Sequence, residues 1–139
     1  MIRRATIADT LHVATLGHKF IEAAQMPAAT IEHCIDFCAR ALSSDQCGCF
    51  VSDGGVILGV LSGLYYRPDY LQVSELFWWA EDGMGKALLA ALEDWGREMG
   101  AKEINMSTLD YFTHKKIETL LEVRGYELRE KTFRKNLGA

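Results

Sequence analysis

The residues with the clearest chemical potential lie between positions 75 and 89. Gly83, Met84 and Gly85 separate a strand-like run from a helical pattern. The first backbone amides of a helix have no intrahelical partner, and the helix dipole adds positive potential at that end. Because the two glycines carry no side chain, an anion such as a phosphate can approach the main chain closely. This turn is therefore predicted to bind an anion.

Glu75 is the best candidate for a general base. It is a lone carboxylate in a strand-like run of apolar and aromatic residues. Burial there would raise its pKa toward neutrality, because desolvation disfavours the charged form. Such a group can accept a proton from an ammonium, whose pKa is about 10.4 in lysine. The alternative interpretation is an ordinary exposed residue on the polar face of a strand.

Two nucleotide-binding motifs do not fit this stretch. A dinucleotide fingerprint needs a third glycine after Gly85. A Walker loop needs a four-residue spacer before its lysine and a serine or threonine after it. Lys86 lacks that spacer and is followed by Ala87. The histidines and acidic residues show no metal-ligand spacing, so no metal is expected.

Four cysteines, Cys34, Cys38, Cys47 and Cys49, are close in the sequence. Zinc sites commonly use Cys-x2-Cys pairs, whereas the spacings here are Cys-x3-Cys and Cys-x-Cys. The first two cysteines fall on the apolar face of a predicted helix, and the other two share one face of a predicted strand. Free cysteine often behaves as a small buried hydrophobe, so we interpret all four as core residues. A zinc site and a redox pair are the alternatives.

Composition limits the classes of protein and partner. The chain has 139 residues, of which 49% are hydrophobic and 24% charged. This length and balance predict a single globular domain over residues 1–139. The formal net charge of −4 argues against broad binding to nucleic acid, which needs a basic face. No apolar run is long enough to span a bilayer, and the first residues do not resemble a signal peptide, so we expect a cytoplasmic location without membrane attachment.

Hydrophobic periodicity predicts the elements that position these residues. Strands are expected at 2–7, 47–52, 56–66, 71–79, 101–108 and 126–135, and helices at 10–24, 31–42, 83–99 and 112–123. The order β-α-α-β-β-β-α-β-α-β indicates a mixed α/β fold with helices on a twisted sheet. The helix between 71–79 and 101–108 makes these two strands parallel neighbours, and the rest of the sheet is expected to be mostly antiparallel.

Local signals mark the ends of these elements. Asp9 or Thr10 is the expected cap of the first helix, and Thr30 caps the second. Gly100 is placed to end the helix at 83–99 in the left-handed conformation. Tight turns are expected at 53–55, where two glycines would supply positive φ, and at 67–69.

The sequence resembles the GNAT superfamily of acetyl-CoA-dependent N-acetyltransferases. The element order matches over nearly the whole chain. The segment Gly83–Leu89 is similar to the second half of the family's pyrophosphate motif, Arg/Gln-x-x-Gly-x-Gly/Ala. The stretch Leu120–Leu128, with Gly125 and Tyr126, is similar to the family's late helix-glycine-aromatic-strand segment.

The resemblance implies how a cofactor would bind. The strand ending at Trp79 would splay from the strand at 101–108, and its free main-chain groups would bind the pantetheine arm. Amides between Glu81 and Lys86 would hold the pyrophosphate, with the acetyl thioester pointing toward Glu75 and Phe77. The cofactor-binding residues implied are Phe77, Trp78, Trp79, Glu81, Asp82, Gly83, Met84, Gly85, Lys86 and His114.

The sequence departs from the family pattern at two positions. The first Arg/Gln of the motif falls on Ala80, and the tyrosine that often acts as general acid falls on Leu121. The frequent asparagine of the preceding loop falls on His114. Tyr111 and His114 come just after the strand at 101–108, and either could donate a proton to the departing thiolate or contact the cofactor.

The resemblance therefore predicts an N-acetyltransferase that moves an acetyl group from acetyl-CoA to a primary amine by direct attack in a ternary complex. Amides of Phe77–Trp79 would polarise the carbonyl. The acceptor would be a small-molecule or protein amine, and a homodimer is compatible with the family. The alternative, favoured by Ala80 and Leu121, is a non-catalytic GNAT-like module that binds CoA or a protein partner.

Overall fold

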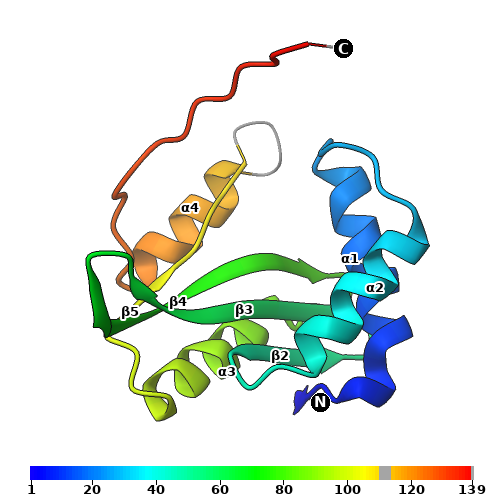
Figure 1. Cartoon of the computed structure of the whole chain (residues 1–139), viewed down its shortest axis with the longest axis horizontal. Helices are drawn as coiled ribbons and strands as arrows, with labels where there is room; N and C mark the ends of the chain where they lie inside the picture. The colour runs from blue at the N-terminus through cyan, green and yellow to red at the C-terminus, as the bar shows by residue number, and fades with distance from the viewer. Residues whose placement is uncertain (110–113, 139) are drawn as a thin grey trace. The chain divides into compact units, whose positions relative to one another are not determined.

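The computed structural model describes residues 1–109 and 114–138, and the chain forms two compact units, Met1–Ser107 and Thr108–Ala139. The first unit contains β1 (Arg3–Arg4), a 3-10 helix (Ile7–Asp9), α1 (Thr10–Ala23), α2 (Ile31–Leu42), β2 (Cys47–Ser52), β3 (Gly55–Leu64), β4 (Arg67–Ala80), α3 (Gly85–Glu98) and β5 (Glu103–Asn105). The second unit contains α4 (His114–Val123). Figure 1 shows these elements in chain order.

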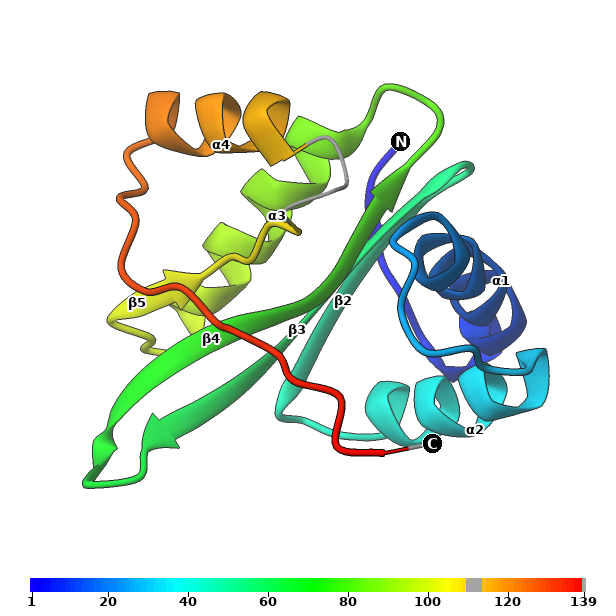
Figure 2. The same ribbon diagram turned by 90° about the horizontal axis from the view of Figure 1, so that it is seen from above.

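The first unit is built on a five-stranded sheet with the order β1-β2-β3-β4-β5. All neighbouring pairs are antiparallel except β4 and β5, which are parallel. α1 and α2 cover one face of this sheet and α3 covers the other (Figure 2). The mixed, mostly antiparallel α/β fold predicted from the sequence is confirmed, and so is the element order from the first strand through α4.

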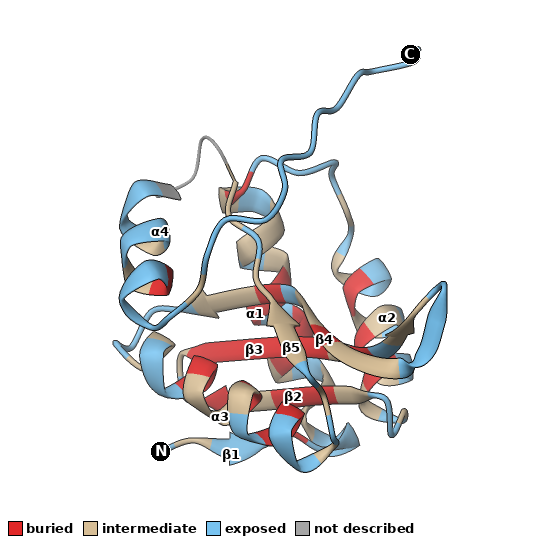
Figure 3. Cartoon of the chain, turned by 90° about the vertical axis from the view of Figure 1, so that its left-hand side faces the viewer, coloured by how far each residue is buried: buried red, intermediate tan, exposed pale blue. Residues whose placement is uncertain are grey.

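The core lies on both faces of β2 and β3, where Figure 3 shows a concentration of buried residues. On the α3 face, Trp95 packs so closely on β2 that a Cβ atom at Gly48 would lie 2.5 Å from its Cδ2. Leu92 is fully buried, and a Cβ at Gly59 would lie 3.1 Å from its Cδ1. Glycines in these strands therefore let α3 approach the sheet.

The cysteines lie in the core beneath α1 and α2, as predicted. Cys34, Cys38 and Cys49 are buried members of this core, and Cys47 packs against it. All four thiols are free. Burial raises the pKa of Cys38 to about 11 and that of Cys49 to about 12, so both thiols stay protonated at neutral pH.

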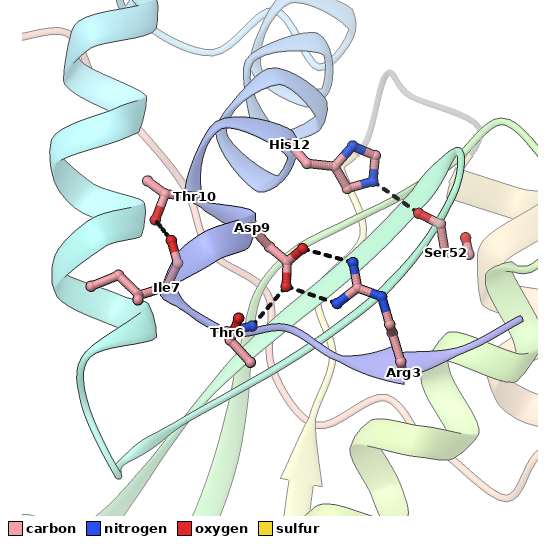
Figure 4. Close-up of polar contacts among 7 residues, drawn as sticks. All are labelled: Arg3, Thr6, Ile7, Asp9, Thr10, His12 and Ser52. Carbon is pink, nitrogen blue, oxygen red and sulfur yellow. Dashed lines mark hydrogen bonds and ion pairs between the residues drawn. The ribbon is translucent and has the colours of Figure 1, made fainter.

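Two of the predicted helix-end signals, Thr30 and Gly100, are confirmed. Thr30 caps α2 as expected, because its hydroxyl accepts from the His33 amide over 3.1 Å. Gly100 has φ +83°, as expected for a residue that ends a helix. Asp9 occupies the N-cap position of α1 as expected, but its side chain makes no capping hydrogen bond to that helix. Asp9 instead pairs with Arg3 over 2.7 Å and accepts the Thr6 amide (Figure 4), so the cap stabilises the preceding 3-10 helix.

Several predicted boundaries are also wrong. The first strand shrinks to Arg3–Arg4, because the chain turns into the 3-10 helix at Ile7. The strand expected at 101–108 covers only Glu103–Asn105, where β4 is within pairing distance. The second hairpin turns at residues 65–66, so Arg67 already belongs to β4.

The glycines of the first hairpin serve a purpose other than the one expected. Neither Gly54 nor Gly55 has a positive φ. A Cβ at Gly55 would instead lie 2.7 Å from Leu88 Cδ1 and 2.8 Å from Ser52 Oγ. Close approach, and not backbone conformation, therefore requires glycine at this position.

The strand or hairpin predicted at 126–135 does not form in the described residues. Gly125, with φ +93°, follows the end of α4, and residues 126–138 are described without a strand. Tyr126 and Leu128 alternate with the charged residues Glu127 and Arg129, as residues of a strand would. Periodicity alone does not supply the neighbouring strand that must satisfy the backbone hydrogen bonds.

Candidate active site

A β-bulge interrupts β4 beside Glu75. Gly59 of β3 pairs with Glu75 and the preceding residue, Leu58, pairs with Phe77, which leaves Leu76 as the extra residue. A bulge of this kind reverses the side-chain alternation of a strand. Leu76 is accordingly 43% exposed in an otherwise apolar run.

The two sides of the bulge face opposite layers of the fold. Val73 faces α3, since a Cβ at Gly96 would lie 3.2 Å from its Cγ2. Phe77 faces α1, since a Cβ at Gly17 would lie 3.3 Å from its ring. In a regular strand, residues four apart would share a face. The bulge therefore lets β4 contribute to both cores and places an irregular backbone next to Glu75.

β4 and β5 stop pairing immediately before Glu75. Their ladder runs from Gln72 opposite Glu103 to Ser74 opposite Asn105. β4 then continues to Ala80, whereas β5 ends at Asn105 and the chain after it diverges from β4 (Figure 2). Within Met1–Ser107, no strand pairs with this edge of β4 after Ser74. The divergence that the family resemblance implied is present.

Glu75 reaches across this divergence. Its Oε1 accepts a hydrogen bond of 3.2 Å from the main-chain amide of Ser107. Burial raises its pKa to about 7, because the surrounding protein disfavours the charged form, and the Ser107 amide opposes this shift only in part. Of the two interpretations of Glu75, the partly buried carboxylate of elevated pKa describes the structure.

The aromatic residues after the bulge alternate between faces. Phe77 is buried, and its ring centroid lies 6.4 Å from that of Phe20 in α1. Trp78 lies on the α3 side and donates its Nε1 hydrogen to the Gly85 carbonyl over 3.1 Å. Trp79 packs against the core beneath α1. The two tryptophans therefore face opposite sides of the sheet, and the Phe77 side chain belongs to the core.

Some amides of the predicted anion site already have partners. The Glu81 amide donates to the Gly54 carbonyl over 2.8 Å, and the Met84 amide donates to Asp82 Oδ1 over 3.2 Å. The first amide bonded within α3 is that of Leu88, which donates to Met84.

In the part of the chain that the structure describes, the amides at 85–87 make no hydrogen bond. This run of unbonded amides overlaps the predicted range of Glu81–Lys86 at residues 85 and 86 and extends to residue 87. Gly83 has φ +76°, so it supplies the left-handed turn that leads into α3.

Glu81, an acidic residue of the loop before α3, is held by two hydrogen-bond donors. Glu81 accepts hydrogen bonds from Trp79 Nε1 over 3.0 Å and from Lys19 Nζ over 3.2 Å. These two donors, Trp79 first, lower the pKa of Glu81. Lys19 belongs to α1, and nothing in the sequence around it indicates that it would meet this loop.

The remaining candidates belong to the second unit or to residues that are not described. Tyr111 lies outside the described residues. His114 is the first residue of α4, and Leu121 lies in its last turns, where its carbonyl accepts the Tyr126 amide over 3.0 Å.

Sequence reasoning missed two features of the site. The sequence does not mark Leu76 as a bulge, because apolar and polar residues around it do not alternate regularly. Ser107 lies in a segment that was predicted to continue as a strand, and its amide is available to Glu75 only because that strand ends early.

Neither a metal centre nor a membrane span emerges from the described residues. Across 1–109 and 114–138, no three His, Cys, Asp or Glu side chains are arranged to hold a metal ion. No helix in the same residues combines the length and apolar character that crossing a bilayer requires.

Comparisons with known proteins identify the fold. No protein-family model and no curated protein matches the sequence. Among solved structures, the aminoglycoside N-acetyltransferase AAC(6′)-Iy in complex with CoA is similar over 98% of this chain and 93% of that one, with 15% identity and a TM-score of 0.77.

Two further structures are similar over the full length. A ribosomal-protein-alanine N-acetyltransferase from Brucella melitensis biovar Abortus 2308 has 13% identity, coverage of 99% of both chains and a TM-score of 0.72. A predicted acetyltransferase with acetyl-CoA from Clostridium acetobutylicum has 9% identity, coverage of 99% and 96%, and a TM-score of 0.76. The fold of this chain is therefore that of the GNAT acetyltransferases.

Proposed function

We propose that this protein is an acetyl-CoA-dependent N-acetyltransferase that acts on a primary amine. The observation that carries the proposal is Glu75. It is a carboxylate with a pKa of about 7, held at a bulge where β4 and β5 stop pairing. A carboxylate in such an environment is suited to proton transfer near neutral pH.

The main chain of the first unit fits the cofactor. The amides at 85–87 and the positive end of the α3 dipole suit the pyrophosphate. The edge of β4 after Ser74 can accept the pantetheine arm as an added strand, through main-chain hydrogen bonds. Main-chain amides of Phe77–Trp79, just after the bulge, are the groups that would polarise the thioester carbonyl.

Glu75 would remove the proton that prevents the amine from attacking. A primary ammonium with a pKa of about 10.4 is almost fully protonated at pH 7, so a base accelerates the reaction there. The amine nitrogen then forms a bond to the carbonyl carbon, and the carbon–sulfur bond breaks. The electron pair of that bond leaves with the thiolate. The nitrogen, which is positively charged after the attack, loses its second proton to solvent, and the thiolate takes a proton from water or from Tyr111.

The acceptor is proposed only as a class. One structural neighbour is named as an aminoglycoside N-acetyltransferase and another as a ribosomal-protein-alanine N-acetyltransferase. Both kinds of acceptor, a small-molecule amine and a protein amine, are therefore proposed for this chain.

Calorimetric titration with acetyl-CoA, followed by assay against a panel of small-molecule and peptide amines, tests the proposal. We expect stoichiometric binding and acetylation of at least one amine class. Binding without acetylation of any amine would favour the non-catalytic CoA-binding module, to which Leu121 also points because it cannot donate a proton. Absence of binding would contradict both the acetyltransferase and the CoA-binding module, and would favour a module that acts through a protein partner.

A further inference from the structure

Asp82 lies in the loop between β4 and α3, and both of its carboxylate oxygens are engaged by the protein. Oδ2 accepts hydrogen bonds from Ser52 Oγ over 2.6 Å and from the Gly54 amide over 2.9 Å. Oδ1 accepts the Met84 amide over 3.2 Å. One side chain thus joins the end of β2, the β2–β3 turn and the residue that precedes α3.

Asp82 is an exposed residue, but one of the groups that it contacts is buried. Ser52 is only 5% exposed, although it is polar. A Cβ at Gly54 would lie 3.2 Å from Asp82 Cβ, so the turn and the loop are in close contact. The loop cannot shift outward without breaking the hydrogen bonds of Asp82, or inward without colliding with the turn.

Ser52 is itself held from the other face of the sheet. His12 Nε2 in α1 lies 2.9 Å from the Ser52 carbonyl (Figure 4). Because a carbonyl oxygen only accepts, this nitrogen carries the hydrogen of the pair. The Asp82 carboxylate is therefore anchored to a residue that both β2 and α1 keep in place.

We infer that Asp82 is a positioning residue for cofactor binding, which holds the start of α3 so that the amides at 85–87 face the pyrophosphate. This inference rests on the proposed function. The carboxylate of Asp82 would not contact the cofactor, because Ser52, Gly54 and Met84 occupy its oxygens. Its effect is preorganisation, since a loop fixed before binding loses less conformational freedom when the ligand arrives.

Charge and positioning make opposite predictions for this residue. A carboxylate near a pyrophosphate repels it, so removing the negative charge of Asp82 would strengthen acetyl-CoA binding if charge were its only contribution. If Asp82 positions the loop, the same substitution weakens binding. Asp82→Asn separates the two, because it keeps the shape of the side chain and removes the charge.

The experiment measures acetyl-CoA binding to the full chain by calorimetry, with amide hydrogen exchange at Met84 as a second readout. Asp82→Ala is expected to weaken binding by about tenfold or more, the effect of losing several hydrogen bonds to a charged group. Asp82→Asn and Ser52→Ala should weaken it less, and each should speed exchange at Met84. Asp94→Asn, an exposed aspartate of α3 that pairs with Arg97, is the matched control and should bind as the parent does.

Each result has a distinct meaning. If the parent binds acetyl-CoA and both Asp82→Asn and Ser52→Ala bind it as tightly or more tightly, the positioning role is overturned while the proposed function stands. If the parent binds no acetyl-CoA, the proposed function fails and this inference falls with it. Because these two substitutions keep nearly the native side-chain volume, the test does not depend on whether Asp82→Ala folds.

Discussion

The main-chain amide of Ser107 donates a hydrogen bond to Glu75 Oε1 over 3.2 Å, at the place where β4 and β5 have stopped pairing. In a continuing ladder such an amide would bond to a main-chain carbonyl of the neighbouring strand. Here a carboxylate takes that position. Glu75 is therefore fixed at the divergence, and it remains buried enough for its pKa to rise to about 7.

The elevated pKa of Glu75 predicts a pH-dependent effect on stability. Its folded-state pKa of about 7 lies above the ordinary value of 4.5, so the folded protein holds this proton more tightly than the unfolded chain does. The parent should lose stability as the pH rises from about 4.5 to 7. Glu75→Gln, which cannot ionise, should gain on the parent over that interval by about 3 kcal/mol in free energy of unfolding.

Urea unfolding at several pH values measures this difference. The control is Glu98→Gln, which changes an exposed glutamate at the C-terminal end of α3 and should show no such trend. A constant difference between Glu75→Gln and the parent from pH 4 to pH 8 would mean that Glu75 has an ordinary pKa.

Gly83 and Gly85 should respond differently to the same substitution. Gly83 has φ +76°, which strains any residue with a Cβ, so Gly83→Ala should lower the free energy of unfolding by about 1 kcal/mol. A Cβ at Gly85 would lie 3.6 Å from Ala80 Cβ and 3.7 Å from Trp78, which are ordinary contact distances. Gly85→Ala should therefore be neutral or slightly stabilising in α3. Equal effects of the two substitutions in chemical denaturation would show that the turn is not strained.

Buried cysteine side chains should contribute to stability and not to cofactor binding. Cys38 belongs to α2 and is only 2% exposed, so Cys38→Ala leaves a cavity that costs about 1 kcal/mol or more. Acetyl-CoA affinity should not change. Thermal unfolding and calorimetry measure the two quantities, and the idea that Cys38 is only a packing residue would be abandoned if affinity fell while stability did not.

The sequence predicts features that depend on a few neighbouring residues. Thr30 caps α2 and Gly100 ends α3 because each needs only the adjacent turn of helix. The parallel pairing of β4 and β5 was also predictable, since a crossover helix restricts the topology.

Features that depend on tertiary contacts were not predictable. The bulge at Leu76 forms because β4 packs on α3 at Val73 and on α1 at Phe77, and neither contact is visible in the sequence. The Asp82 hydrogen bonds join residues that are 28 and 30 positions apart. In the candidate site, the raised pKa of Glu75 was predictable from its surroundings in the strand, whereas its hydrogen bond with Ser107 was not.

The most direct test of the account is the pH dependence of acetyl transfer by the parent and by Glu75→Gln, with Glu98→Gln as the control. In the parent, kcat/KM should rise as the pH passes about 7 and Glu75 ionises. Glu75→Gln should bind acetyl-CoA as tightly as the parent but transfer the acetyl group about a hundredfold more slowly near neutral pH, the usual contribution of a general base. The deficit should shrink toward about pH 10, where much of the amine is already neutral. Transfer by Glu75→Gln at the parent rate over the whole range would contradict the assignment of Glu75 as the base.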